Sequence, residues 1–170
     1  MQYHYLNLQN FLQVPEPLIQ KEFSRIMSLK DGSKKMSKSE LSDLSRINLT
    51  DDKDLIINKI KKAKTDPLPM PNTTKELDQR LEAKNLLGIY SSLTNSTLEK
   101  SVENFAGKNF SEFKQKLSEV LVDKIQPIST EIKKLLDDKS YLDNTLLEGV
   151  ERANIIASKK IKRIKEIVGF

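Results

Sequence analysis

The sequence contains no cysteine and no long apolar run. Without cysteine the chain has no disulfide, no thiolate metal site and no cysteine nucleophile. No apolar stretch approaches the roughly 20 residues that a membrane-spanning helix needs, and the N-terminus lacks the basic-then-apolar pattern of a signal peptide. We therefore expect a protein of the cytoplasm, or of an organelle matrix, with no membrane association.

Histidine is almost absent as well, since His4 is the only one. We expect it to be a surface residue rather than a catalyst. The 170 residues suit one compact domain, or a small domain with part of another. With 37% hydrophobic and 31% charged residues, the composition is that of an ordinary globular protein.

Positive charge is in excess: the net charge is +5 and the isoelectric point is near 9.2. This balance is compatible with a polyanionic partner. The two densest basic runs are residues 59–64 and 159–165. Each is either the solvated face of an amphipathic helix or a surface that meets RNA phosphates, and charge alone leaves both interpretations open.

The first part of the chain is predicted to be extended. Residues 25–29 have the composition of a strand that ends at a turn over residues 30–33. A polar loop rich in serine and lysine then runs to about Ser45.

From about Thr50 onward the pattern predicts a small helical bundle. Thr50 is expected to cap the first helix, with Asp51 and Asp52 in its first turn, where negative charge is favoured. Three prolines within residues 66–72 end this segment as a linker. The apolar stripe of this helix is Ile56, Ile60 and Ala63.

Further helix starts follow the prolines. Thr73 with Glu76, and Ser96 with Glu99, match the capping box, and Asn109 is expected to cap a longer helix. The apolar positions at helical spacing are Leu98, Val102, Phe105, Phe113, Leu117, Val120 and Leu121, then, beyond a kink at Pro127, Ile128, Ile132 and Leu135, and finally Leu146, Val150, Ala153, Ala157, Ile161 and Ile164.

The segment with the clearest chemical meaning is Lys35-Met36-Ser37-Lys38-Ser39. Two lysines three residues apart supply mobile positive charges, and the small hydroxyl residues between them let backbone amides approach a phosphate group. Phosphate chemistry depends mainly on positioning and on charge stabilisation. The pattern therefore indicates a triphosphate-binding loop, with a solvated lysine-rich loop as the alternative.

In its context this loop resembles the second signature of class I aminoacyl-tRNA synthetases. Residues 25–29, a short turn and residues 34–39 resemble the tryptophanyl-tRNA synthetases in particular, whereas the tyrosyl enzymes share the architecture but less of this string. The resemblance extends from Phe11 to Phe170. It includes the segments 14–19, 59–66, 85–91, 106–108 and 149–153.

The resemblance implies a tryptophan–tRNA ligase, which activates tryptophan with ATP and transfers it to its tRNA. ATP is then a substrate, and Mg²⁺ accompanies it with no protein ligand identified. Lys35 and Lys38 are implied to be catalytic through the ATP phosphates, with Lys38 stabilising the departing pyrophosphate. The ATP-binding residues so implied are Ile26, Lys35, Met36, Ser37, Lys38 and Ser39. For Ile26 the alternative is strand packing, and Ser39 has the alternative of shaping the loop only.

The fold implied is mainly α. Residues 1–48 would be the C-terminal remnant of a Rossmann-type nucleotide-binding domain, and residues 49–170 a helical domain that binds the anticodon side of the tRNA. The chain lacks the "HIGH"-type adenine motif and a glycine-rich first strand-to-helix turn. The implied partners are therefore tRNA(Trp) and the N-terminal half of the catalytic domain. The family homodimer is also implied, through an interface mostly absent from this chain. We expect the isolated chain to be inactive; the alternative function is a non-catalytic tRNA-binding module or a relic of a truncated synthetase.

Overall fold

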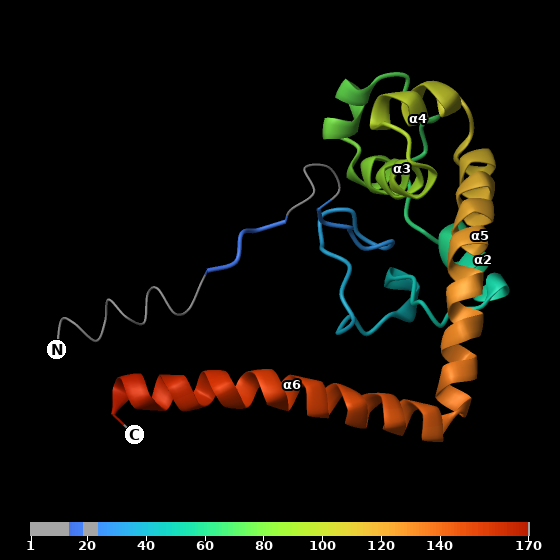
Figure 1. Ribbon diagram of the computed structural model, residues 1–170. Coiled ribbons are helices and arrows are strands. Elements are labelled where there is room, and N and C mark those ends of the chain that lie inside the picture. The colour runs from blue at the N-terminus through green and yellow to red at the C-terminus, as the bar shows by residue number, and fades with distance from the viewer. Residues whose placement is uncertain (1–13, 19–23, 170) are drawn as a thin grey trace. The chain divides into compact units, whose positions relative to one another are not determined.

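The computed structural model describes residues 14–18 and 24–169, and this part of the chain is mainly helical, as expected (Figure 1). His4 lies outside the described residues. The elements in chain order are the 3-10 helix η1 (Asp43–Ser45), α2 (Lys53–Lys61), the 3-10 helix η2 (Thr74–Asp78), α3 (Leu81–Thr94), α4 (Leu98–Phe105), α5 (Phe110–Asp137) and α6 (Lys139–Val168). By its contacts the chain divides into two units: Gln20–Lys133 form one, and Met1–Ile19 with Lys134–Phe170 form the other.

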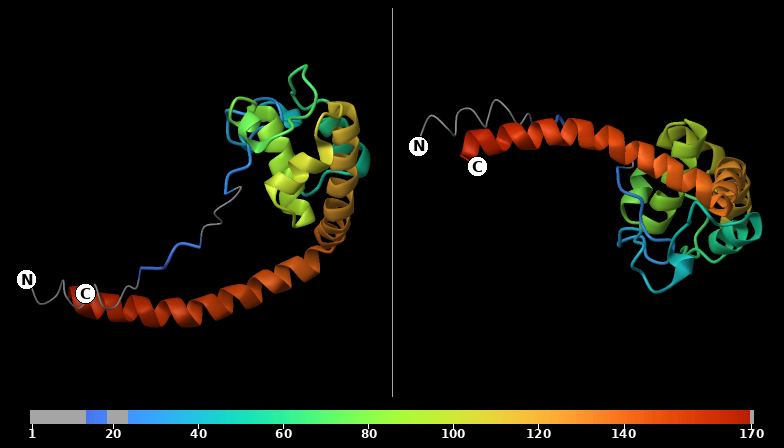
Figure 2. Two further views of the ribbon diagram at one scale, coloured as in Figure 1. Left: turned by 90° about the horizontal axis from the view of Figure 1, so that it is seen from above. Right: turned by 60° about the horizontal axis from the view of Figure 1, so that its bottom comes forward.

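A single apolar core holds the unit Gln20–Lys133 together. Helix α3 is central to it and packs on η2 and α4, while Figures 1 and 2 show α2 lying alongside α5. Three aromatic rings, of Tyr90, Phe105 and Phe113, meet edge to face with centroids 4.9–6.1 Å apart, a favourable arrangement for ring quadrupoles. Leu29, 2% exposed, belongs to the same core. The segment before the loop is thus packed against the helices.

The strand expected over residues 25–29 does not form within the described part of the chain. A single antiparallel bridge, Met27 with Lys35, takes its place. On the side away from Lys35, the Met27 backbone faces helix α3 instead of another strand. The Asn85 side chain of that helix forms hydrogen bonds with the Met27 amide and carbonyl. Local composition favours a strand here, but it contains no information on whether a neighbouring strand is present to pair with this segment.

Two of the expected helix caps are wrong. The N-cap of α2 is Asp52, whose carboxylate accepts from the Leu55 amide at 2.8 Å, rather than Thr50. The N-cap of α4 is Thr97, rather than Ser96. In both cases two or more capping residues stand in a row, so the sequence does not determine which one takes the position.

The helix α5 agrees with the expected pattern in its first half. Phe113, Leu117 and Leu121 are at most 4% exposed, and Asn109 directly precedes the helix. Pro127 lies inside α5 and does not end it. Ile128, which was expected to resume the buried stripe, is 45% exposed, so that expectation is wrong.

The predicted last helix is confirmed as α6, which begins after the cap Asp138 and ends at Gly169, where φ is +88°. Its apolar stripe is present, but none of the described side chains of α6 is buried. Leu146 is 67% exposed and Ile161 is 52% exposed. A helix with one apolar face normally buries that face, whereas no described side chain of the α6 stripe is buried.

Candidate nucleotide-binding site

The candidate loop, residues 35–39, begins at the β-bridge, where Lys35 lies opposite Met27. Two backbone hydrogen bonds flank this bridge, from the Ser28 amide to the Lys34 carbonyl at 2.8 Å and from the Met36 amide to the Ile26 carbonyl at 3.0 Å. These bonds fix the register of the two segments. The position of the Lys35 backbone therefore depends on the position of the Met27 backbone.

The turn before the loop closes against the start of α3. The Asp31 carboxylate accepts from the amide and the hydroxyl of Ser33 at 3.0 and 2.6 Å, and these bonds hold the pKa of Asp31 below its usual range. Gly32 is buried, and a Cβ at this position would lie 2.8 Å from backbone atoms of Leu81 and Glu82. Only glycine permits this close approach of the turn to the helix.

The backbone of Met27 is held by the side chain of Asn85 in α3. The Met27 amide donates to Asn85 Oδ1 at 2.9 Å, and Asn85 Nδ2 donates to the Met27 carbonyl at 2.8 Å. The amide side chain thus makes the same two bonds that a neighbouring strand would make. Asn85 is 8% exposed, so water does not easily replace it.

We expect Asn85→Leu to lower the free energy of unfolding by about 2 kcal/mol, because it leaves the amide and the carbonyl of Met27 without partners in a half-buried place. Urea unfolding of the chain measures this. Asn154→Leu, at an exposed site of α6, is the control and should change the stability by less than about 0.5 kcal/mol. Equal stability of Asn85→Leu and the unmodified chain would contradict the role given to the two hydrogen bonds between Asn85 and the Met27 backbone.

The tip of the loop is organised by its two serines. Ser37 Oγ accepts from the Ser39 amide at 3.2 Å and lies 3.3 Å from Ser39 Oγ, a local serine turn. Met36 is half-buried and packs on the core, as does Ile26. The predicted site residues therefore divide into two sets. Ile26 and Met36 are apolar and pack on the core. The polar residues of the loop are exposed: Lys35, Ser37, Lys38 and Ser39.

Lys35 and Lys38 are exposed. Among the residues that the structure describes, neither forms an ion pair, whereas neighbouring Lys34 lies 3.5 Å from the Asp31 carboxylate. The loop thus presents two positive charges that no carboxylate of the described residues neutralises. Such an arrangement suits an anionic ligand such as a polyphosphate.

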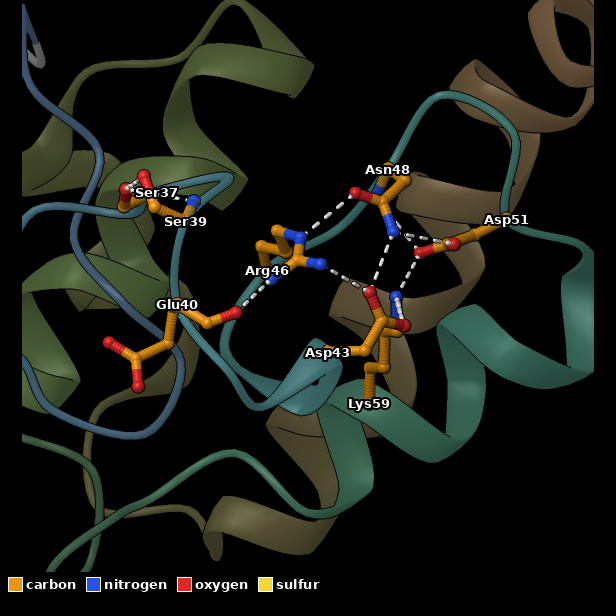
Figure 3. Close-up of polar contacts among 8 residues, drawn as sticks. All are labelled: Ser37, Ser39, Glu40, Asp43, Arg46, Asn48, Asp51 and Lys59. Atoms are coloured by element: carbon orange, nitrogen blue, oxygen red, sulfur yellow. Dashed lines mark hydrogen bonds and ion pairs between the residues drawn. The ribbon is translucent and has the colours of Figure 1, made fainter.

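Sequence reasoning missed a polar cluster directly beyond the loop (Figure 3). It consists of Asp43, Arg46, Asn48, Asp51 and Lys59. Lys59 Nζ, on α2, lies 2.6 Å from Asp43 Oδ2 and 2.6 Å from Asp51 Oδ2, and the hydrogen bond from Lys59 holds the pKa of Asp43 below its usual range. We call this group the Lys59 cluster.

This cluster corrects one interpretation of the basic run 59–64. Lys59 is 0% exposed, so it is neither part of a solvated face nor available to RNA. Lys61 and Lys62 are exposed, as the solvated-face interpretation requires. The sequence does contain a signal for this pairing. Lys59 is in line with the apolar stripe of its helix, and a buried lysine needs a carboxylate partner. Asp43 and Asp51, shortly before the helix, are available for that role.

A groove of about 970 Å³ lies between α2 and α5. The Lys114 ammonium spans one side of it and donates to the carbonyls of Lys61 and Ala63 at 3.2 and 2.6 Å, and burial lowers the pKa of Lys114. The groove also has Ile57, Phe110 and Val122 in its lining. No predicted site residue lines it.

Within residues 14–18 and 24–169, no three acidic, histidine or cysteine side chains are grouped so that they could hold a metal ion. In the same ranges, no helix is both long and apolar enough to cross a membrane.

Known proteins resemble this chain in sequence and in fold. Residues 2–126 match the family described as tRNA synthetases class I (W and Y). The tryptophan–tRNA ligase of Mesorhizobium japonicum is 45% identical over 163 residues, which are 96% of this chain and 46% of that protein. The ligase of Rickettsia felis is 49% identical over 162 residues, which are 95% of this chain and 48% of that protein. The chain thus spans about half the length of these curated relatives.

Solved structures agree on the fold. A crystal structure of tryptophanyl-tRNA synthetase from Mycoplasma pneumoniae superposes with a TM-score of 0.77 at 24% identity, over 95% of this chain and 49% of that one. The Campylobacter jejuni enzyme complexed with ADP and tryptophan superposes with a TM-score of 0.66 at 21% identity, over 97% of this chain and 51% of that one.

Proposed function

This chain belongs to the tryptophanyl and tyrosyl group of class I tRNA synthetases, and on that premise we propose that it is the C-terminal portion of a tryptophan–tRNA ligase. The observation that carries the proposal is the 49% identity to the Rickettsia felis tryptophan–tRNA ligase over 95% of the chain. The proposed activity is ATP-dependent activation of tryptophan, followed by transfer to tRNA(Trp). Its proposed place is the cytoplasm.

The loop supplies the charge for this chemistry. Activation moves negative charge from the α-phosphate of ATP onto the departing pyrophosphate, and Lys38 is proposed to stabilise that group, with Lys35 on the neighbouring phosphate oxygens. Both ammonium groups are exposed and unneutralised in the described residues, which supports this assignment. The backbones and hydroxyls of Ser37 and Ser39 are proposed to contact the nucleotide as donors.

The apolar anchors have a matching role. Ile26 is half-buried beneath the loop and is proposed to lie against the adenine, with the backbone of Met36 contacting ATP. Mg²⁺ is proposed to accompany the triphosphate, bound by its oxygens and by water, which is the usual way in which this ion is held with nucleotides. It would neutralise phosphate charge alongside the lysines.

Two domains are proposed, with the boundary at residues 48 and 49. Residues 1–48 would be the end of a Rossmann-type nucleotide-binding domain, and residues 49–170 the helical domain on the anticodon side. The single bridge at Met27 supports the first assignment, since it is a fragment of paired backbone whose outer edge is capped by Asn85.

The exposed apolar side chains of α6 support a partner for this chain. Leu146, Val150 and Ile161 are 52–67% exposed, and an uncovered apolar face of this length is unfavourable in water. The N-terminal half of the catalytic domain is proposed to cover it. The homodimer of the family is proposed to need that half as well.

Transfer RNA is the second proposed partner. Residues 159–165 of α6 carry an exposed basic face, on which Arg163 pairs with Glu166 at 2.9 Å. Such a face is proposed to meet backbone phosphates, which position a nucleic acid without reading its bases. No residue of this chain is assigned to the anticodon itself.

We expect the isolated 170-residue chain to show no tryptophan-dependent exchange of pyrophosphate into ATP. The loop alone holds one end of the nucleotide, and without adenine and tryptophan contacts the reacting atoms do not reach a productive geometry. Isotope exchange with purified protein measures this. Robust exchange by the isolated chain would contradict the expected dependence on another half.

The positive arm of this experiment is a chimera, in which the chain replaces the matching 162-residue segment of the Rickettsia felis ligase. We call it the Rickettsia chimera. Tryptophan-dependent exchange by the chimera supports the ligase function. A chimera that binds tRNA without exchange activity would favour the non-catalytic tRNA-binding module instead.

A further inference from the structure

Arg46 is the member of the Lys59 cluster that contacts the end of the loop (Figure 3). Its Nη1 donates to the carbonyl oxygen of Glu40 at 2.9 Å, which is two residues beyond Lys38. Its Nη2 lies 3.0 Å from Asp43 Oδ1, and its Nε donates to Asn48 Oδ1 at 3.2 Å. The Arg46 side chain is 18% exposed, whereas that of its partner Asp43 is 49% exposed, so the guanidinium lies at the surface with part of its area covered.

The partners of Arg46 other than Glu40 are themselves bound to further residues. Asn48 Nδ2 donates to Asp43 at 3.0 Å and to Asp51 at 3.2 Å. Both carboxylates are in turn bound by the buried Lys59 ammonium at 2.6 Å. Since Lys59 belongs to α2, Arg46 connects the carbonyl of Glu40 to a helix of the core. A guanidinium that bonds three polar partners at once is a stiff connection, because charge-assisted hydrogen bonds in several directions fix its geometry.

The two ends of the loop are therefore held by different means. The first end is held by the bridge of Lys35 to Met27, which Asn85 clamps to α3. At the second end, the Glu40 amide donates to the Ser37 carbonyl at 3.5 Å, a contact that lies within the loop itself. Among the described residues, the bond from Arg46 Nη1 is the side-chain contact that joins the Glu40 backbone to the rest of the fold.

We propose that Arg46 is a positioning residue for Lys38: it joins the Glu40 carbonyl to the other members of the Lys59 cluster, and this holds the backbone at Lys38 in place beneath the departing phosphates. The proposal rests on the proposed function. Arg46 itself touches no reacting atom. The guanidinium is suited to positioning the Glu40 carbonyl because its planar group donates hydrogen bonds in three fixed directions. A lysine ammonium on its flexible side chain does not offer this fixed geometry.

The first test concerns the loop alone and uses the 170-residue chain. Arg46→Met keeps most of the apolar stem and removes the fork. Backbone ¹⁵N order parameters of Lys38, Ser39 and Glu40 should fall from values typical of ordered backbone, about 0.85, towards about 0.6 or less. Those of Met36 and of α3 should stay unchanged. Unchanged values at the loop would overturn the proposal, and so would an equal fall throughout the chain, which indicates a general structural role.

Asn48→Ala provides the matched control. Asn48 contacts Arg46, Asp43 and Asp51 but makes no contact with the loop. Asn48→Ala leaves the Arg46 contacts with Glu40 and Asp43 in place, so it should lower the order parameters of residues 38–40 much less than Arg46→Met does. A fall as large as that of Arg46→Met would show that the loop follows the cluster as a whole, and the specific role of Arg46 would be lost.

The second test measures whether Arg46 acts through Lys38. In the Rickettsia chimera, Arg46→Met should lower kcat of pyrophosphate exchange by about tenfold, with the KM for tryptophan changed less than about twofold, because a small misplacement of a catalytic group reduces the rate rather than substrate binding. In a Lys38→Ala background the same change should lower kcat by less than about twofold. A tenfold loss in both backgrounds would overturn the proposal. An inactive unmodified chimera would instead count against the proposed ligase function, and the order parameters would still decide the role of Arg46.

Discussion

Replacing Lys38 by alanine in the Rickettsia chimera should lower the rate of tryptophan activation by about a hundredfold to a thousandfold, with a much smaller change in the KM for tryptophan. A positive group aimed at the departing pyrophosphate interacts most strongly when negative charge has moved there. Its loss therefore falls on the transition state rather than on substrate binding. A preorganised donor of this kind contributes on the order of 3–4 kcal/mol. Steady-state pyrophosphate exchange measures the effect.

Lys34→Ala is the matched control for this experiment. Lys34 stands next to the loop, its side chain is 71% exposed, and its ammonium faces the Asp31 carboxylate at 3.5 Å rather than open solvent alone. An exposed pair of this kind contributes little, so the rate should change by only a small factor. Equal losses for Lys34→Ala and Lys38→Ala would mean that the loop acts as a diffuse positive patch, and the specific role of Lys38 would fail.

Replacing Lys59 by methionine should lower the free energy of unfolding of the chain by about 3–5 kcal/mol. Methionine fills a similar volume, but it leaves Asp51 without its cationic partner at 4% exposure. Removing one member of a buried ion pair has this magnitude because an unpaired charge remains in the interior. Urea unfolding followed by circular dichroism measures the change.

Lys61→Met serves as the control, since Lys61 lies on the same helix and its side chain is exposed. It should change stability by no more than about 1 kcal/mol. A second variant, Lys59→Met with Asp51→Leu, removes the buried charge together with its partner and should recover part of the loss. If Lys59→Met and Lys61→Met are equally stable, the cluster is not a buried ion network, and the rigid support given to Arg46 would be lost with it.

The helices are the part of the fold that periodicity predicts well. Ile56, Ile60 and Ala63 are buried as a stripe, and Phe113, Leu117 and Leu121 form another, because in each case one side of a helix meets the core. Helix caps were predicted less well, since Thr50, Asp51 and Asp52 are all competent caps and only the packing of α2 selects Asp52.

The missed features depend on contacts between residues far apart in the sequence. Asn85 replaces a strand for Met27, 58 residues away, and no local pattern indicates such a pairing. Lys59 stands in a basic run for which the sequence leaves a solvated face and an RNA-binding surface open, whereas its two carboxylate partners come from the segment before α2. The exposed apolar stripe of α6 is the opposite case, because the pattern is present and its cover is not among the described residues.

The loop itself was recognised from its residues and their context, and the structure places the predicted residues in two sets. Ile26 and Met36 pack on the core, and Lys35 and Lys38 extend from it without ion pairs in the described part of the chain. Their contacts with ATP stay predictions. Arg46 was not expected from sequence, because its role depends on a backbone carbonyl, and a carbonyl is present at every residue.

The most direct test of the proposed function is amino-acid-dependent pyrophosphate exchange by the Rickettsia chimera, compared with the isolated chain. Tryptophan and tyrosine are supplied in separate reactions, since both amino acids fall within the family. The ligase function predicts exchange that depends on tryptophan, is within about tenfold of the parent enzyme, is not supported by tyrosine and is absent from the isolated chain. A folded chimera without tryptophan-dependent exchange would contradict it.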